Sequence, residues 1–384
     1  MRYTIGQLAE IIDGDRGKNY PKQDEFYPQG YCLFLNTGNV TKEGLIFEEN
    51  QFIMKEKDEA LRKGKLKRGD IVYTTRGTVG NAGYYNSSVP YENVRINSGM
   101  VILRSDGEIV DARFLYQILK SEYYRPYFKQ YCTGSAQPQL PIKNFSQIYL
   151  NVPDIKTQHR IADILSVYDD LIENNQKQIK LLEEAAQRLY KEWFVDLRFP
   201  GHENTKIVDG VPEGWSRGLL KELISVNYGK DHKKAPDDGN IPVYGSGGLM
   251  RKCNKSLFSG EAVLIPRKGS LNNIMYVDET FWTVDTMFYA TMKQPHTAVF
   301  VYFFVKAFDM YSMNIGAAVP SMTAKILDAM DVVIPDKETM EKFDKRAKTY
   351  FNKIKTLQGQ NNRLKIARDL LLPKLMYETQ KGDF

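Results

Sequence analysis

The polar residues best suited to hold a ligand gather in short segments that contain glycine. In TTRGTVGN (residues 74–81), Thr75, Arg76 and Thr78 flank Gly77. Glycine lets a backbone turn tightly and lets a ligand approach it closely. Guanidinium and hydroxyl groups bond both to phosphates and to base edges. The segment therefore predicts a nucleic-acid contact, with an ordinary hairpin tip as the alternative.

Similar segments recur in both halves of the chain. In GSAQPQ, Gln137 is the residue that we expect to contact adenine, because an amide side chain can bond twice to that base. In the second half, YGKDHKK, VYGSGGLMRK and PRKGSLNN supply lysine, arginine, hydroxyl and amide groups. The sequence does not separate base contacts from phosphate contacts. The expected DNA-contacting residues are Lys18, Asn19, Thr75, Arg76, Thr78, Ser135, Gln137, Gln139, Lys230, Lys233, Lys234, Ser246, Arg251, Arg267, Lys268, Ser270 and Asn272.

Charge alone permits a nucleic-acid partner without requiring one. The chain carries 53 basic and 47 acidic residues, a formal net charge of +6. The most basic stretch is residues 55–68, KEKDEALRKGKLKR, with seven basic and three acidic residues. This stretch either lies along phosphates or forms a solvated helix face.

Motifs for catalysis are missing from the sequence. We find no GxxxxGK[ST] phosphate loop, no [ND]PP[YF] methyltransferase tetrapeptide and no GxSxG nucleophile elbow. The four histidines are too scattered for an HExxH site, and the three cysteines are far apart, which indicates reduced thiols. We therefore expect no metal and no cofactor on this chain, with catalysis supplied by partners.

One phrase occurs twice and divides the chain into halves. CTGSAQPQLPIKNFSQIYLNVPD (132–154) corresponds to NIGAAVPSMTAKILDAMDVVIPD (314–336), at a constant offset of 182 residues. The matching pairs are Gly134 and Gly316, Pro138 and Pro320, Lys143 and Lys325, and Pro153-Asp154 and Pro335-Asp336. Upstream of this phrase, Arg76 corresponds to Arg267 at an offset of 191, which predicts that the two arginines occupy equivalent turns.

Each copy of the phrase leads into a long helical pattern. Apolar residues recur there at steps of three and four, which is the period of a coiled coil. Asp154 and Thr157 can cap the first helix, which we expect from about Gln158 to Phe194. Gly359 is expected to interrupt the second helix, and the polar seam residues Asn175 and Asn361 are expected at different heights. The remaining predicted seam residues are Ile161, Leu165, Tyr168, Ile172, Ile179, Leu182, Leu189, Phe343, Tyr350, Ile354, Leu357, Leu364 and Leu371.

These patterns predict an α+β protein with an internal pseudo-two-fold repeat. We expect β-rich domains with short helices at residues 1–153 and 200–335, the latter including a Gly/Pro-rich linker. Long helices at 154–199 and 336–384 are expected to pair with each other as a coiled coil. Two similar domains related by an approximate two-fold axis suit the two-folds of B-DNA. Because the domains differ in sequence, the target should be bipartite and asymmetric.

The order and duplication of these phrases resemble the specificity subunits of type I restriction-modification systems. The resemblance rests on the paired ends GSAQPQLPIKNFSQIYLNVPD and IGAAVPSMTAKILDAMDVVIPD, the helix QHRIADILSVYDDLIENNQKQIKLLEEAAQRLYKEWF, and the phrases FPGH, VPEGW and VYGSGG. It implies two target recognition domains on double-stranded DNA. It also implies that the two helices form an antiparallel coiled coil and dock two methyltransferase subunits. It also implies S-adenosylmethionine on those subunits, and ATP and Mg on restriction subunits.

Two alternatives remain: the recognition module of a fused type II-like restriction-modification enzyme, and a coiled-coil adaptor that binds protein only. Apolar content is 42%, and no apolar run reaches the roughly 20 residues that span a bilayer. We also see no signal-type segment at the N-terminus. The expected location is therefore the cytoplasm of a bacterium or archaeon, in association with DNA and away from membranes.

Overall fold

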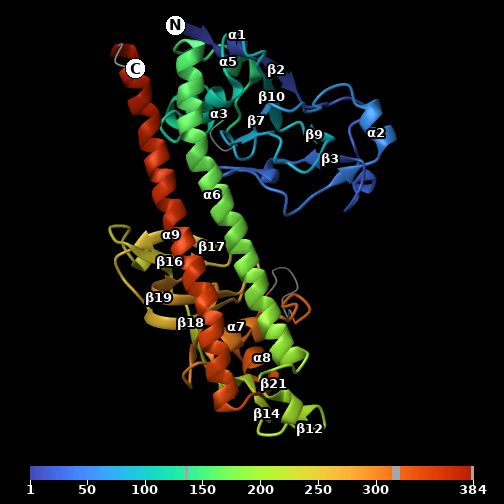
Figure 1. The fold of residues 1–384 in the computed structure, drawn as a ribbon, viewed down its shortest axis with the longest axis vertical. Coiled ribbons are helices and arrows are strands. Elements are labelled where there is room, and N and C mark those ends of the chain that lie inside the picture. Colours follow the sequence, from blue (N-terminus) through green and yellow to red (C-terminus); the bar gives the residue numbers. More distant parts are fainter. Residues whose placement is uncertain (135–136, 314–320, 382–384) are drawn as a thin grey trace. The chain divides into compact units, whose positions relative to one another are not determined.

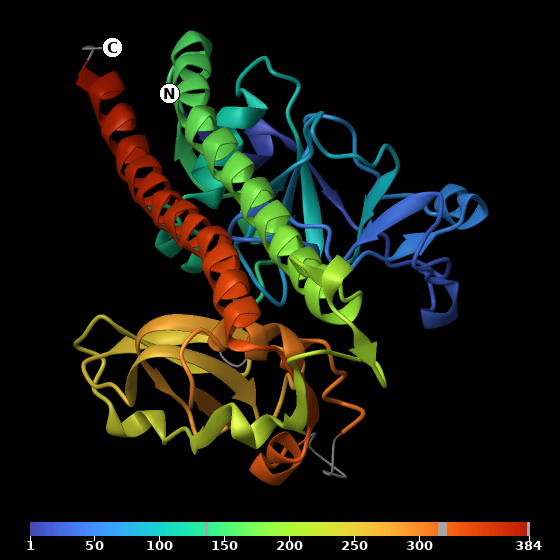
Figure 2. The same ribbon diagram turned by 60° about the horizontal axis from the view of Figure 1, so that its bottom comes forward.

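The computed structural model describes residues 1–134, 137–313 and 321–381, and the chain forms two compact units. The first unit holds residues 1–175 and the chain from Gly359 onward, and the second holds residues 176–358. Each unit contains one α+β domain and part of each of two long helices, α6 (Ile155–Tyr190) and α9 (Lys337–Lys381) (Figure 1, Figure 2). The predicted α+β class with two long helices is confirmed.

The duplicated Pro-Asp pair starts both long helices. The Asp154 carboxylate accepts hydrogen bonds from the Thr157 backbone N–H at 3.0 Å and from its hydroxyl at 2.7 Å. Asp336 accepts the same two bonds from Thr339, at 2.9 and 2.6 Å. The Thr157 hydroxyl and backbone N–H lower the pKa of Asp154, so the cap stays charged near neutral pH. The predicted cap at Asp154 is confirmed.

The ends and continuity of the helices differ from expectation. α9 runs without a break through Gly359, so the predicted interruption is wrong. One glycine costs a helix only about 1 kcal/mol relative to alanine, which the packing of a long helix outweighs. α6 ends at Tyr190 rather than at Phe194, and the chain then widens into a single π-helical turn at Lys191–Val195.

In the first unit the two helices are antiparallel. The Asn175 side-chain amide donates to the side-chain oxygen Oδ1 of Asn361 at 2.8 Å, and the Arg368 guanidinium donates to the Asp169 carboxylate at 2.8 Å. Residue numbers therefore rise along one helix as they fall along the other. The expectation that the two asparagines lie at different heights is wrong. Aligning the two repeated phrases compares the helices in the same chain direction, and the asparagines then fall at different positions. In an antiparallel pair the second helix runs the opposite way, which brings these two residues together.

The predicted seam residues are buried or half-buried along the two helices. Some members are buried and others are half-buried because a seam between only two helices stays partly open to solvent. The buried ones are Ile161, Leu165, Ile172, Asn175, Leu189, Phe343, Ile354, Leu357 and Asn361, and the half-buried ones are Tyr168, Ile179, Leu182, Tyr350, Leu364 and Leu371.

Each portion of the helix pair also packs on the domain of its own unit. In the first unit, Ile161 and Leu165 share a core with Phe114 and Leu375. In the second unit, aromatic rings dominate the contact, and the Phe194 and Phe343 ring centroids lie 4.7 Å apart. Burial of such side chains contributes roughly 1.5–3 kcal/mol each. The helices are therefore part of both domain cores rather than a free-standing coiled coil.

The first domain is built from two main sheets. One has the order β2-β10-β7-β8, all antiparallel, and the other has the order β6-β3-β9, with β3 and β9 parallel. The strands are β1 (Arg2–Thr4), β2 (Glu10–Asp13), β3 (Cys32–Leu35), β4 (Val40–Thr41), β5 (Gly44–Leu45), β6 (Phe52–Ile53), β7 (Ile71–Thr74), β8 (Ala82–Tyr84), β9 (Val94–Ile96), β10 (Met100–Arg104) and β11 (Tyr149–Asn151). The helices are α1 (Ile5–Leu8), α2 (Lys55–Ala60), α3 (Ala112–Lys120), α4 (Arg125–Lys129) and α5 (Ile142–Ser146).

The second domain fuses the equivalent strands into one sheet of order β15-β20-β18-β19-β16-β17, in which β16 and β19 are parallel. The strands are β12 (Ile207–Val208), β13 (Val211–Pro212), β14 (Ser216–Leu219), β15 (Ile224–Tyr228), β16 (Ile241–Gly245), β17 (Gly248–Cys253), β18 (Phe258–Pro266), β19 (Met275–Thr283), β20 (Met287–Met292) and β21 (Asp331–Ile334). The helices are α7 (Ala298–Lys306) and α8 (Ala324–Asp328). Within the described residues, no helix is long and apolar enough to cross a bilayer.

Candidate nucleic-acid interface

Two asparagine turns lie side by side at one edge of the first domain. β3 and β9 are parallel neighbours, so the segments that follow them leave the sheet at the same edge (Figure 1). The Asn97 backbone N–H donates to Leu35 O at 3.0 Å. The Asn36 side chain accepts from the Gly38 N–H at 2.7 Å, and the Asn97 side chain accepts from Gly99 at 2.9 Å. LNTG and INSG therefore fold into matching turns.

The turn that carries Arg76 is hydrogen-bonded to this edge through its backbone. The N–H groups of Thr75 and Arg76 both donate to Gly99 O, at 2.9 and 3.1 Å. Leu140 N–H donates to Thr75 O at 2.9 Å, which brings in the segment that carries Gln137. The Arg16 guanidinium bonds to Ser98 O at 3.2 Å. We define residues 14–19, 36–38, 76–78, 97–99 and 137–139 as the first loop face.

The second domain repeats this pattern of backbone hydrogen bonds between its turns, which we call the backbone frame. Arg267 and Lys268 N–H donate to Thr286 O at 2.9 and 3.3 Å, and Met322 N–H donates to Arg267 O at 2.9 Å. Val284 N–H bonds to Tyr244 O at 3.0 Å, as Asn97 bonds to Leu35 in the first domain. We define residues 229–234, 246–248, 268–270, 284–286 and Ser321 as the second loop face.

These hydrogen bonds correct the predicted match between Arg76 and Arg267. Arg76 corresponds to Lys268, and Thr75 corresponds to Arg267, at an offset of 192 rather than 191. The glycine that follows each turn agrees, since Gly77 and Gly269 both adopt positive φ, 69° and 85°. Matching the two arginines by residue type shifted the alignment by one position.

Two glycines hold equivalent positions for a steric reason. A Cβ on Gly14 would lie 2.2 Å from Asn97 O, and a Cβ on Gly229 would lie 1.9 Å from Val284 O. Both distances are far below van der Waals contact, so each site accepts glycine alone. The basic segments 14–19 and 229–234 therefore cross the neighbouring turn at the closest approach that a backbone allows.

Most of the predicted contact residues within the described part of the chain are exposed. Thr75 is buried, and Ser135 lies outside the described residues, as do Gly316 and Pro320 of the repeated phrase. Asn19, Ser246, Arg251 and Arg267 are half-buried, and the exposed residues are Lys18, Arg76, Thr78, Gln137, Gln139, Lys230, Lys233, Lys234, Lys268, Ser270 and Asn272.

Two of the predicted arginines are engaged inside the second domain. Arg251 donates to His232 Nδ1 at 3.3 Å and to Ala235 O at 2.7 Å, and it also pairs with Asp237. It thereby fixes the segment that carries Lys233 and Lys234. The Arg267 guanidinium carbon lies 5.3 Å from the centroid of the Tyr228 ring, and its Nη1 donates to Asp285 O at 3.2 Å. Both arginines position the loops that surround them.

Three other candidates use their side chains locally. The Thr75 hydroxyl donates to Gly99 O at 3.1 Å, and the Asn19 amide donates to Ala60 O at 2.9 Å. The Asn272 side chain donates to Asp309 at 3.0 Å and accepts from Met310 N–H at 2.8 Å. These side chains stabilise the loop faces.

Among the loop-face residues that sequence reasoning missed are four polar residues of the two asparagine turns and one aspartate. Asn36, Thr37, Asn97 and Ser98 lie on the first face, and Asp285 lies on the second. The similar segments LNTG and INSG were the signal that could have identified the four residues of the first face. Each segment places an Asn-x-Gly turn directly after a buried strand.

Basic groups outnumber acidic ones on both faces, and the acidic groups mostly bond to the backbone. The Asp15 carboxylate accepts from Gly17 N–H at 2.7 Å and from Arg62 N–H at 2.8 Å. The bond from Gly17 is the main cause that lowers the pKa of Asp15 below its ordinary value. Asp231 likewise accepts from Lys233 N–H at 3.0 Å. Such carboxylates shape the turns.

Part of the basic stretch at residues 55–68 forms ion pairs inside the first domain. It forms α2 and the loop after it. Buried Asp58 pairs with Arg95 at 2.5 Å and with Lys65 at 2.5 Å. Two charges of this stretch therefore hold the domain together, while Lys63 and Lys67 are exposed.

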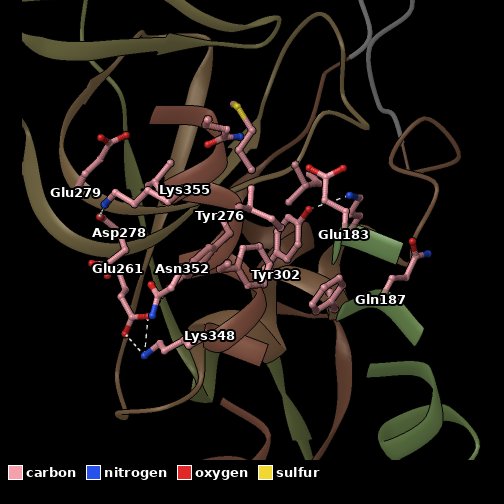
Figure 3. A pocket seen from close by; sticks show the side chains of 18 of the residues that line it. Glu183, Gln187, Glu261, Tyr276, Asp278, Glu279, Tyr302, Lys348, Asn352 and Lys355 are labelled. Atoms are coloured by element: carbon pink, nitrogen blue, oxygen red, sulfur yellow. Dashed lines mark hydrogen bonds and ion pairs between the residues drawn. The ribbon is translucent and has the colours of Figure 1, made fainter. Parts of the chain in front are cut away.

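The second unit also contains a hollow of about 840 Å³ beside α6, α9 and β19 (Figure 3). Several of its polar groups bond to one another. Lys348 pairs with Glu261 at 2.8 Å, and the Tyr276 hydroxyl donates to Glu261 at 2.5 Å. Lys355 donates to Asp278 O at 3.1 Å. Acidic and basic side chains line it together, so it lacks the uniform positive charge that suits DNA.

The fold and the two loop faces define a recognition protein with two domains, each carrying the same backbone frame and different side chains. A family model, the type I restriction modification DNA specificity domain, matches residues 1–184 and 212–365. The chain belongs to this family.

Individual relatives agree with this assignment. The type I restriction enzyme HindI specificity subunit of Haemophilus influenzae is 24% identical over 97% of this chain and 99% of its own length. The MjaIX specificity subunit of Methanocaldococcus jannaschii is also 24% identical, over 83% of this chain and 80% of its own. The crystal structure of an S subunit from M. genitalium shares the fold, with a TM-score of 0.56 at 18% identity, covering 98% of this chain and 95% of that one.

Proposed function

We propose that this chain is the DNA-binding specificity subunit of a type I restriction-modification complex. The first loop face contacts one half of a bipartite target, and the second loop face contacts the other. The observation that carries the proposal is the shared frame. Equivalent backbone hydrogen bonds position Arg76, Thr78 and Ser98 in one domain and Lys268, Ser270 and Asp285 in the other. One geometry with two sets of side chains suits two different sequences.

In this proposal the chain supplies recognition, and its partners supply catalysis. Two methyltransferase subunits dock on the helices, bind S-adenosylmethionine and methylate adenine. Restriction subunits join them and use ATP and Mg. The helices set the length of the spacer between the half-sequences. The supports are the family and the absence of catalytic motifs from the sequence. The same subunit role implies a cytoplasmic location beside DNA.

The test is to map methylated adenines genome-wide in a host with and without the gene, together with its methyltransferase partner. We expect a bipartite, asymmetric sequence that is methylated only when the gene is present. Methyl transfer by the rigorously purified chain alone would contradict the proposal and favour a fused enzyme. A lack of DNA binding by the assembled complex would favour a protein-only adaptor.

A further inference from the structure

An exposed carboxylate stands on the second loop face without a bond to any residue that the structure describes. Asp285 lies at the tip of the turn between β19 and β20. Neighbouring acidic residues are engaged: Asp231 with the Lys233 N–H, and Asp237 with Arg251. Within the described residues, the Asp285 carboxylate makes no hydrogen bond or ion pair.

The backbone under this carboxylate is fixed on both sides. Arg267 Nη1 donates to Asp285 O at 3.2 Å, and Val284 N–H donates to Tyr244 O at 3.0 Å. Thr286 O accepts from the Arg267 and Lys268 N–H groups. Lys230 N–H donates to Thr283 O at 3.0 Å, so a second basic segment flanks the turn. The backbone that carries this acidic side chain is thus fixed by hydrogen bonds from basic residues on both sides.

A carboxylate is a poor group to place against a DNA backbone. Phosphate oxygens repel it, and they offer no hydrogen-bond donor. In the major groove, the donors are the amino groups of cytosine at N4 and of adenine at N6. An ionised carboxylate only accepts hydrogen bonds, so these amino groups are its complement.

We propose that Asp285 is a specificity-determining residue that accepts a hydrogen bond from the amino group of a cytosine or an adenine in one half of the target. The proposal rests on the proposed function of the chain. The equivalent position in the first domain is Ser98, since Gly99 O and Thr286 O accept the same pair of bonds. A serine hydroxyl both donates and accepts, so the two domains differ in selectivity at this position.

The test compares Asp285→Ala with Asp238→Ala, a change at an exposed aspartate of the same domain outside the loop face. Alanine is used because an asparagine amide would still accept from the same amino groups. Each variant loses one negative charge. The complete complex with its methyltransferase partner and S-adenosylmethionine is given DNA with randomised half-sequences, and the methylated products are sequenced. Thermal unfolding of both variants, beside the parent chain, checks the fold.

We expect Asp285→Ala to weaken the preference at one position of one half by roughly 5- to 150-fold, because a good base contact is worth about that much discrimination. The other half should stay unchanged. Loss of preference for cytosine or for adenine identifies the amino group. Asp238→Ala should leave every preference as in the parent.

Two outcomes overturn the inference in distinguishable ways. If the parent methylates a bipartite target and Asp285→Ala has the same preferences as Asp238→Ala, Asp285 contacts no base and the proposed function stands. If the parent complex methylates no particular sequence, the proposed function fails and the inference fails with it.

Discussion

At the scale of single residues, Arg76 and Lys268 occupy the same turn in the two domains. Their N–H groups bond to Gly99 O and Thr286 O, and both side chains are exposed. A planar guanidinium can bond twice to guanine, whereas an ammonium suits a phosphate. The two equivalent residues therefore have different expected roles.

We predict that Arg76→Ala weakens binding to the target by about 1–3 kcal/mol and relaxes selectivity at one base pair. Lys268→Ala should instead weaken all sequences alike and reduce the salt slope by about one unit. Fluorescence anisotropy of labelled duplexes across a salt series measures both quantities. Parental binding by both variants, with unchanged folding, would show that these turns face away from DNA.

For Arg267 we predict a loss of stability in addition to any loss of binding. Its guanidinium packs over Tyr228 and Phe288 and holds the turn at Asp285. Arg267→Ala should lower the thermal midpoint of the protein more than Lys268→Ala does, because Lys268 is exposed. Differential scanning calorimetry measures the change. Equal midpoints for the two variants would show that the Arg267 side chain does not stabilise the domain.

The residues that sequence reasoning missed share a physical cause. Asn36 and Asn97 lie 61 positions apart and become neighbours only because β3 and β9 pair in parallel. Periodicity within one segment carries no information about that pairing. The shift from Arg267 to Lys268 has a similar origin, since hydrogen bonds to Thr286 fix the alignment and residue identity does not. Helix positions, caps and the duplication follow from local patterns, and these were predictable.

At the scale of elements, the contact between Asn175 and Asn361 pins the helix pair. Both residues are buried, and their side chains bond to each other at 2.8 Å. A shift of either helix by one turn would leave both amides buried without partners. Such polar pairs specify register at some cost in stability.

We predict that Asn175→Leu or Asn361→Leu alone destabilises the protein by about 1–3 kcal/mol, since the remaining amide stays buried and unpaired. The double variant should recover most of this loss, which gives a favourable coupling in a double-mutant cycle. Urea unfolding measures the cycle, and Asn174→Leu, at an exposed neighbour, is the control. Additive losses would mean that the two amides do not depend on each other.

A buried charged cluster joins α3 to both helices of the first unit. Asp169 receives Lys120 and Arg368, each at 2.8 Å, and the Gln117 amide at 2.6 Å. Burial acts to raise the pKa of Asp169, but Lys120 and Arg368 outweigh it and hold the pKa below its ordinary value. A lowered pKa means that the cluster stabilises the fold above pH 4 and loses this effect as the pH falls through the folded-state pKa.

We therefore predict that Asp169→Asn costs about 3–5 kcal/mol at pH 7, because two buried cations lose their counter-charge. The difference from the parent should shrink below about pH 4, where the parent carboxyl takes up its proton. Urea unfolding at several pH values measures this difference. Asp163→Asn, which removes an exposed pair with Arg113, should change stability by less than about 1 kcal/mol. A pH-independent difference would refute the electrostatic account.

At the scale of the whole molecule, both long helices pass from one unit into the other. The 36 residues of α6 correspond to about 54 Å of helix at 1.5 Å per residue. In the proposed function this length sets the unread spacer between the half-sequences. The loop faces determine which bases are recognised, so spacer and half-sequences should vary independently.

This independence gives the last prediction. Seven residues inserted into each helix, after Asn175 in α6 and after Gln358 in α9, keep the phase of a 3.5-residue seam and add about 10 Å. At about 3.4 Å per base pair, the spacer should grow by roughly three base pairs while both half-sequences stay the same. Methylation maps of the parent and the variant measure the change. Insertion into α6 alone is the control and should lower stability, because the seam then loses its partner over the added turns. Changed half-sequences with an unchanged spacer would mean that the helices themselves contact the bases. The length of the helices would then not determine the length of the spacer.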